Sequence, residues 1–296
     1  MKAVVLRETG GPESLQVEEV DEPGEPALTV RAAGVNFMDL LMRRGQYPQM
    51  PELPHVLGSE VAGELDGRRV FGLTPGAAGG GYAERVEIDP QWTFELPEGA
   101  GFEEGAAFLM AYLTSWMPLR RVEADTVLVT AASGGVGSAA VQVAKHLGSR
   151  VVAAASTDEK RRFALGLGAD EAVGYDELPP CDVAFDPVGG DVFAACLTAL
   201  RPLGTVIAVG YAGGIWQDVN PALLVGRNVS VQGFYLGRLM RLAPGLVRAA
   251  ADEVLELWRS GAVRPVVGAT FPLEQAADAH RLIDERKHMG KVVLTV

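Results

Sequence analysis

The 296-residue sequence contains only two cysteines, Cys181 and Cys196, and only four histidines. Two cysteines exclude a framework of disulfides, and their spacing fits no zinc-binding pattern, so we expect both to be reduced and buried. The histidines are scattered and offer no tetrahedral set of zinc ligands, so we expect each to be an ordinary surface or cap residue. They are His55, His146, His280 and His288.

Basic residues are also scarce, with 26 Lys and Arg against 38 Asp and Glu, for a net charge of −12. The largest basic cluster is Lys160-Arg161-Arg162, and this balance argues against a nucleic-acid partner. No apolar run approaches the roughly 20 residues that cross a bilayer. The first residues lack the long apolar core and cleavage site of a signal peptide. We therefore expect a cytoplasmic protein with no membrane partner.

The arrangement of short strands and helices predicts the fold class. Single cores stop growing at about 250–300 residues, so we expect two domains. The first hundred residues combine strand-like runs with Gly/Pro turns, which indicates a β-rich, barrel-like unit. From about Thr126 short apolar strands alternate with helices, which is typical of a parallel sheet covered on both faces. Strand-like segments return from Arg264, so the α/β unit is predicted to be an insertion.

Residues 131–137, Ala-Ala-Ser-Gly-Gly-Val-Gly, lie between a predicted strand at 127–129 and a predicted helix at 138–147. A pyrophosphate needs backbone N–H donors with no Cβ in the way, and the start of a helix supplies them with a favourable dipole. Gly134 permits close backbone approach, and Gly137 permits close packing of helix on strand. Ala132 replaces the first glycine of the usual pattern. We prefer a dinucleotide site to a turn without a ligand.

The end of the next strand, at 150–155, favours one cofactor. NAD enzymes generally carry Asp or Glu there to bind the ribose hydroxyls. This strand is followed by Ser156, and the cations from Lys160 to Arg162 can meet a 2′-phosphate. The sequence therefore favours NADPH, although Asp158 and Glu159 are nearby negative charges. Ser156 to Glu159 also forms a capping-box pattern, with Ser156 as the N-cap and Glu159 reaching back to it.

Several motifs occur in order along the whole chain: GVNFMD at 34–39, RGQYP at 44–48, GSEVAG at 58–63, GGYAE at 80–84, DPVG at 186–189 and GKVV at 290–293. With these motifs the chain resembles the quinone oxidoreductase branch of the medium-chain dehydrogenase/reductases, the branch that includes zeta-crystallin. Zinc-dependent relatives carry a His within Gly-His-Glu, where this chain has Ser59. The resemblance therefore implies no metal site.

The resemblance also implies an α/β architecture in two domains, with the active site in the cleft between them. A doubly wound Rossmann domain with a parallel sheet, residues 99–263, is inserted into a discontinuous β-rich GroES-like catalytic domain, residues 1–98 and 264–296. The segment 63–70 is shorter than the loop found in the family, which would leave the substrate cleft more open.

Site residues follow from the same resemblance. Asn36 and Thr114 should lie near the nicotinamide or its ribose, Tyr47 should line the substrate pocket, and these three are the predicted catalytic residues. The predicted cofactor-binding residues are Asn36, Thr114, Ser133, Gly134, Gly135, Val136, Gly137, Ser156, Lys160, Tyr175, Val188, Gly210, Phe234 and Lys291. Ser156, Lys160 and Tyr175 match positions that hold the 2′-phosphate, Phe234 should flank the cofactor, and Lys291 should approach the nicotinamide.

Structural interpretations of several of these residues stay open. Asn36 also suits a turn position. Tyr47 also suits a packing position between the domains, and Tyr175 also suits the half-buried end of a strand. Phe234 also suits an apolar sheet edge used in dimerisation, and Lys291 a solvated position before a strand.

The predicted function is hydride transfer from NADPH to a quinone or a similar conjugated electrophile, without zinc, by a homodimer. An enoyl-thioester or enone reductase is the alternative within the family. An NADPH-binding sensor or scaffold without turnover is the alternative from another class.

Overall fold

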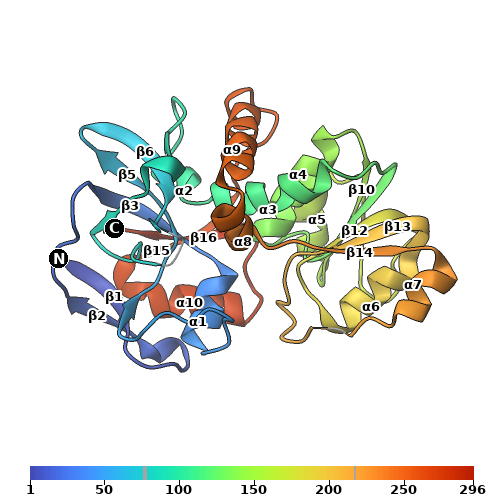
Figure 1. Ribbon diagram of the computed structural model, residues 1–296, viewed down its shortest axis with the longest axis horizontal. Coiled ribbons are helices and arrows are strands. Elements are labelled where there is room, and N and C mark those ends of the chain that lie inside the picture. The colour runs from blue at the N-terminus through green and yellow to red at the C-terminus, as the bar shows by residue number, and fades with distance from the viewer. Residues whose placement is uncertain (76–78, 217) are drawn as a thin grey trace. The chain divides into compact units, whose positions relative to one another are not determined.

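The computed structural model describes residues 1–75, 79–216 and 218–296 (Figure 1). The chain forms two compact units. Unit 1 comprises Met1–Met110, Met240–Ala251 and Pro265–Val296, and unit 2 comprises Ala111–Leu239 and Asp252–Arg264. Unit 1 thus runs past residue 98, where the sequence places the first boundary, and includes a short stretch from the predicted insertion. The assignment of catalysis to one unit and of cofactor binding to the other stays a prediction.

The main sheet of unit 1 unites both ends of the chain. Its strands are β3 (Ala27–Val35), β5 (Glu60–Leu65), β6 (Arg68–Leu73), β7 (Arg85–Glu87), β8 (Thr93–Glu95), β15 (Val267–Pro272) and β16 (Lys291–Thr295). Their order is β15-β16-β3-β5-β6-β8, and β7 pairs with β3. Only β15 and β16 are parallel. The prediction that the two terminal segments belong together is confirmed by the β16–β3 pairing.

Smaller elements complete unit 1. A second sheet has the order β2-β1-β4, made of β1 (Lys2–Leu6), β2 (Leu15–Glu19) and β4 (His55–Val56). The helices are α1 (Phe37–Arg43), α2 (Phe102–Gly105) and α10 (Ala276–Asp284), with 3-10 turns at Pro12–Ser14, Pro90–Trp92 and Leu273–Gln275. α1 and α10 lie side by side (Figure 1). One apolar core joins strands from the first hundred residues to α10 and β16.

The segment 63–70, which the sequence predicts to be shorter than the family's loop, contains a tight hairpin. β5 and β6 are joined by Asp66 and Gly67, whose φ angles are 50° and 73°. Two consecutive residues with positive φ match the twist of antiparallel strands, and this requirement selects Asp-Gly here. The connection between β5 and β6 is therefore two residues long.

Unit 2 contains a six-stranded sheet in which every pair is parallel. The strands are β9 (Thr126–Val129), β10 (Arg150–Ala154), β11 (Glu171–Val173), β12 (Cys181–Asp186), β13 (Leu200–Ala208) and β14 (Ser230–Gly233). The spatial order β11-β10-β9-β12-β13-β14 is the doubly wound order 3-2-1-4-5-6. The predicted Rossmann fold is confirmed. Its topological switch point, where ligands bind in such sheets, lies between β9 and β12.

Helices connect these strands and extend beyond them. They are α3 (Leu109–Leu119), α4 (Gly135–His146), α5 (Asp158–Gly166), α6 (Gly190–Ala199), α7 (Pro221–Arg227), α8 (Leu236–Leu242) and α9 (Pro244–Arg259). The sequence did not predict α1, α3, α7 or α8. α3 reads Leu-Met-Ala-Tyr-Leu-Thr-Ser-Trp-Met-Pro-Leu, which is apolar on almost every side, so it lacks the 3.6-residue periodicity that reveals a helix.

Candidate functional site

The Gly-rich turn of unit 2 lies where the sequence placed it, between β9 and the start of α4. A Cβ on Gly137 would stand 2.1 Å from the Ala131 carbonyl oxygen, so only glycine fits. Ser138 donates its N–H to the Gly134 carbonyl at 2.8 Å. The N–H groups of the preceding helical residues, Gly135 to Gly137, belong to the first turn, where helices offer amide donors to ligands.

Tyr175 forms hydrogen bonds with both this turn and the end of β10. Its hydroxyl accepts the Ala131 N–H at 2.9 Å and donates to the Ala154 carbonyl at 3.4 Å. Ala131 has a φ of 45°, in the left-handed region that is unfavourable for alanine. The hydroxyl thus holds a backbone group next to a strained position, in addition to any contact with a ligand.

The predicted capping box at the start of α5 is wrong in one respect. Thr157, not Ser156, is the N-cap, and its Oγ1 accepts the Lys160 N–H at 3.2 Å. Ser156 lies exposed just before the cap, and Lys160 is partly buried on the first turn of the helix. The hydroxyl of Ser156 therefore has no capping role that would compete with a ligand.

A buried carboxylate organises the loop after β12. Asp186 accepts hydrogen bonds from the Thr130 hydroxyl at 2.5 Å, from the Val188 N–H at 3.0 Å and from the Gly189 N–H at 2.9 Å. Burial raises the pKa of Asp186, and these three donors oppose that shift. The side chain joins the end of β9 to the loop after β12, on the two sides of the switch point. Asp186 stands in the DPVG motif at 186–189 but was not among the predicted site residues.

The other predicted residues of unit 2 follow the carboxyl ends of neighbouring strands. Gly210 follows β13, and a Cβ on it would stand 3.1 Å from the Pro187 carbonyl oxygen. The Gly213 N–H binds the Val188 carbonyl at 2.8 Å. Phe234 follows β14, and its N–H binds the end of β13 at 2.9 Å. The fold therefore brings residues 133–137, 188, 210 and 234 to one edge of the sheet.

In unit 1, three polar side chains meet at the ends of three adjacent strands. Lys291 is the first residue of β16, Asn36 directly follows β3, and Glu60 is the first residue of β5. The register pairs Val292 with Val35 and Gly34 with Glu60, which brings the three together. The Lys291 ammonium donates to Asn36 Oδ1 at 2.7 Å and to Glu60 Oε2 at 3.0 Å. Two of the three, Asn36 and Lys291, were predicted site residues.

Glu60 is the functional candidate that the sequence analysis missed. Its Oε2 also lies 3.4 Å from Asn36 Nδ2, and its Oε1 accepts the Met110 N–H at 3.0 Å, in the first turn of α3. The side chains of Lys291 and Glu60 are 5% and 0% exposed. The predicted alternative of a solvated Lys291 is therefore wrong. A conspicuous signal was present, since Glu60 stands in the motif that distinguishes zinc-dependent relatives.

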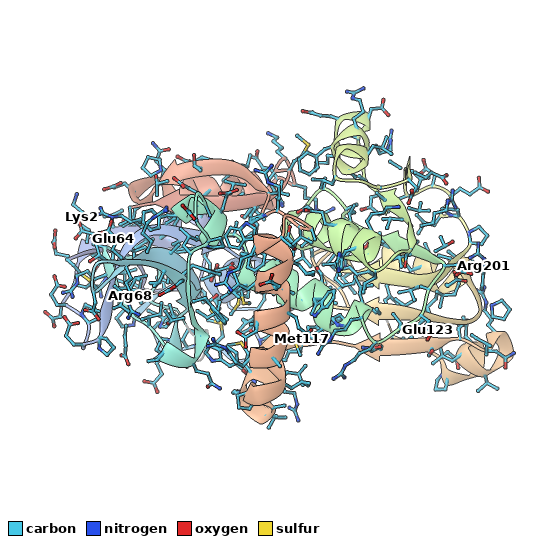
Figure 2. The ribbon with its side chains drawn as sticks, turned by 90° about the horizontal axis from the view of Figure 1, so that it is seen from above. Lys2, Glu64, Arg68, Met117, Glu123 and Arg201 are labelled. Atoms are coloured by element: carbon cyan, nitrogen blue, oxygen red, sulfur yellow. The ribbon has the colours of Figure 1, made fainter. Side chains whose placement is uncertain are left out.

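The buried pair differs in kind from the surface pairs of unit 1. Figure 2 labels Lys2, Glu64 and Arg68, whose side chains are exposed. Their ion pairs, with Glu274, Arg31 and Glu95, span 3.5–4.0 Å. Exposed pairs contribute about 0–1 kcal/mol. Removing one partner of a buried pair leaves an uncompensated charge and costs about 3–5 kcal/mol.

A second buried network lies close to the first. Asp39 accepts the Asn36 N–H at 2.8 Å and the Tyr82 hydroxyl at 3.1 Å, and the same hydroxyl lies 3.3 Å from His280 Nε2. Burial raises the pKa of Asp39 to about 6. The shift is opposed by these two hydrogen bonds, by a third from the Gly58 N–H at 3.4 Å, and by the charge of Lys291. Burial, with the charges of Arg43 and Arg44, lowers the pKa of His280 to about 3.

His280 is thus a core residue, and the expectation that every histidine is a surface or cap residue is wrong for it. The imidazole lies on α10 with no exposed area. Its Nδ1 has no hydrogen-bond partner among the residues that the structure describes. Of the other three, His146 is exposed and His55 and His288 are half-buried. Cys181 and Cys196, in contrast, are both free and buried, as expected.

Tyr47 and Thr114 lie in different units. Tyr47 follows α1 and packs, half-buried, against the apolar core of unit 1. Thr114 is half-buried on α3 in unit 2. Their predicted catalytic roles stay predictions.

The described part of the chain, which omits 76–78 and 217, contains no group of three or more His, Cys, Asp or Glu side chains placed to hold a metal ion. Ser59 is buried, and its hydroxyl contacts the Met38 sulfur at 3.6 Å. In the same described residues, no helix has the length and apolar character needed to span a membrane.

Known protein families and solved structures match this chain in sequence and in fold. Residues 22–98 match the profile "Alcohol dehydrogenase GroES-like domain", and residues 167–294 match the profile "Zinc-binding dehydrogenase". The chain is 33% identical to "Quinone oxidoreductase-like protein 2" of Bos taurus, over 95% of this chain and 89% of that protein. It is 34% identical to "Quinone oxidoreductase" of Pseudomonas aeruginosa, over 99% of both. The quinone oxidoreductase of Thermus thermophilus, solved alone and with NADPH, superposes with a TM-score of 0.91 at 39% identity over the full length of both chains.

Proposed function

The chain belongs to the quinone oxidoreductase branch of the medium-chain dehydrogenase/reductase family, and on that premise we propose that it transfers hydride from NADPH to a quinone or a similar conjugated electrophile without zinc. The observation that carries the proposal is the turn at residues 131–137, which opens α4 beside the switch point of a doubly wound sheet. That position is the ligand site of such sheets. The relative from Thermus thermophilus was crystallised with NADPH.

The residues of unit 2 fit a dinucleotide. Residues 133–137 would hold the pyrophosphate, because the first turn of α4 offers amide donors and Gly137 keeps the backbone clear of a Cβ. Val188, Gly210 and Phe234 would flank the cofactor from the neighbouring strand ends. Asp186 fixes the Val188 loop through two backbone N–H groups. When bound, NADPH supplies the hydride.

The choice of NADPH over NADH rests on Ser156, Lys160 and Tyr175. The exposed hydroxyl of Ser156 is not used as a helix cap, and the Lys160 cation lies on the first turn of α5. A hydroxyl and an ammonium can both donate to a 2′-phosphate. The Tyr175 hydroxyl already holds Ala131 and Ala154, so its part would be to shape the site as well as to contact the phosphate.

The proposed chemistry needs orientation of the reactants and exclusion of water. Asn36 and Thr114 would orient the nicotinamide through an amide and a hydroxyl, and Tyr47 would contact the flat substrate. Ser59 replaces the histidine of zinc-dependent relatives and contacts a methionine sulfur. Conjugated carbonyl compounds accept hydride without a Lewis acid, so turnover should be unchanged by a chelator.

The proposal includes a homodimer in the cytoplasm. β14 is the last strand of its sheet, and its N–H and C=O groups on one side face away from the ladder. In the same unit Leu203 and Val225 expose 85% and 77% of their surface. An open strand edge near exposed apolar side chains supports pairing between two copies.

A titration with NADPH and NADH, followed by a quinone panel and an enoyl-thioester panel, tests the proposal. We expect tighter binding of NADPH and its oxidation by quinones. Lys160→Ala should narrow the difference between the two cofactors, whereas Arg162→Ala, which removes an exposed cation from the same helix, should not. Turnover with thioesters alone would favour the enoyl reductase. Binding without turnover would favour the sensor, and no binding would refute the cofactor site.

A further inference from the structure

The buried pair Lys291–Glu60 has a geometric consequence for Asn36. An ammonium has only hydrogens to donate, so the Asn36 atom 2.7 Å from Lys291 Nζ must be the amide oxygen. Rotating the amide by 180° would place its NH₂ group against the ammonium. The orientation of this side chain, which usually has to be assigned from its partners, is therefore fixed by charge.

The fixed amide has a defined donor. Nδ2 carries two hydrogens, and one of them faces Glu60 Oε2 at 3.4 Å. The second hydrogen is the donor that Asn36 can offer to a ligand. Asn36 keeps 9% of its surface exposed, whereas the two charged side chains behind it are almost fully enclosed. Asn36 is thus the least enclosed of the three side chains.

Glu60 keeps the ammonium in place. Its Oε2 accepts from Lys291, and its Oε1 accepts the Met110 N–H. The carboxylate thus lies between the positive end of the α3 dipole and the buried ammonium, and both attract it. Lys291 therefore has a fixed counter-charge, and its ammonium remains directed at Asn36.

We propose that Glu60 and Lys291 are positioning residues that set the Asn36 amide as a hydrogen-bond donor to a carbonyl oxygen of the bound reactants. This inference rests on the proposed function and changes the predicted role of Lys291, from direct contact with the nicotinamide to action through Asn36. The carbonyl belongs either to the quinone or to the carboxamide of NADPH, and the experiment separates these two sources.

A donor at this place suits the proposed reaction. The quinone accepts a hydride, with its two electrons, from NADPH, which becomes NADP⁺. Negative charge then develops on a quinone oxygen, and that oxygen takes one proton from water. A fixed N–H donor stabilises the developing charge because it needs no reorganisation during the step.

A double-mutant cycle between Lys291→Met and Asn36→Ala tests the inference, with NADPH affinity, kcat and KM measured for each protein. Each single variant should lose at least about tenfold in one of these quantities. Lys291→Met should have no further effect in the Asn36→Ala background, because it acts through the amide. A loss in kcat with unchanged NADPH affinity assigns the carbonyl to the quinone. A loss in NADPH affinity assigns it to the carboxamide.

Controls separate positioning from folding. The double variant Glu60→Gln, Lys291→Met removes both charges, so no buried charge remains unpaired, and it should fold yet share the defect of Lys291→Met. Lys2→Met, in an exposed ion pair, should match the wild type. Additive losses in the cycle, or full activity of the folded double variant, would overturn the inference. If the wild type binds NADPH but reduces no quinone, the proposed function fails, and the cycle in NADPH affinity still decides the positioning role.

Discussion

Protonation of His280 is expected to destabilise the folded protein as the pH falls below about 6.5. The imidazole is fully buried on α10 beside Tyr82, and burial with the charges of Arg43 and Arg44 lowers its pKa to about 3. The same histidine in the unfolded chain has a pKa of about 6.5. Between these two values the unfolded state binds more protons, so acidification favours unfolding.

The size of the effect follows from the linkage relation. For a folded pKa far below the pH, the loss of stability is RT ln(1 + 10^(6.5 − pH)), which is about 1.4 kcal/mol at pH 5.5 and close to zero at pH 8. Asp39 acts in the opposite direction, because burial raises its pKa to about 6 and acidification below that value relieves a buried charge. The pH dependence of the wild type alone therefore does not isolate His280.

Comparison with His280→Phe isolates it. Phenylalanine keeps a ring of similar size and removes the titrating nitrogens. We would measure the free energy of unfolding in urea for both proteins at pH 8.0 and pH 5.5. The stability of the variant relative to the wild type should rise by about 1.4 kcal/mol at the lower pH. His146→Gln, at an exposed position, should show no such change. A difference that is the same at both pH values would refute the lowered pKa.

Three further predictions concern unit 2. Gly137→Ala should cost about 1–3 kcal/mol of stability in urea unfolding, because a Cβ would stand 2.1 Å from a carbonyl oxygen; Gly166→Ala, where nothing lies within 4 Å, should change stability by less than about 1 kcal/mol. Asp186→Asn should cost about 1–3 kcal/mol and weaken NADPH binding in a fluorescence titration, because an NH₂ group would face one of three donors. Thr157→Ala should lose about 1 kcal/mol of stability, whereas Ser156→Ala should keep stability and weaken NADPH binding relative to NADH.

Each of these three predictions has a result that would contradict it. Equal losses for the two glycine variants would contradict close packing at the turn. Unchanged NADPH affinity in Asp186→Asn would remove the carboxylate from the cofactor site. If Ser156→Ala lost as much stability as Thr157→Ala, Ser156 would be the helix N-cap, as the sequence predicted.

The sequence by itself determined the α/β unit and its turn, because the signals there are local. Continuous apolar strands, helices of ordinary length and the glycines at 134–137 stand next to one another along the chain. The site residues at 188, 210 and 234 follow successive strands, and parallel strands bring their carboxyl ends to one edge. The exact helix cap was misassigned by one residue, since Ser156 and Thr157 both suit the role.

Only the tertiary structure decided which distant side chains are buried together. Lys291 donates hydrogen bonds to Glu60 and Asn36, which lie 231 and 255 positions away in the sequence. The strand register that brings them together is not revealed by any local pattern. His280 lies on an amphipathic helix, and the sequence of that helix does not reveal that the imidazole faces the core. Burial then changes the chemistry, because a low-dielectric environment shifts the pKa of an isolated group and makes a charge dependent on its partner. The amide of Asn36 obtains its orientation from that pairing, which the fold alone creates.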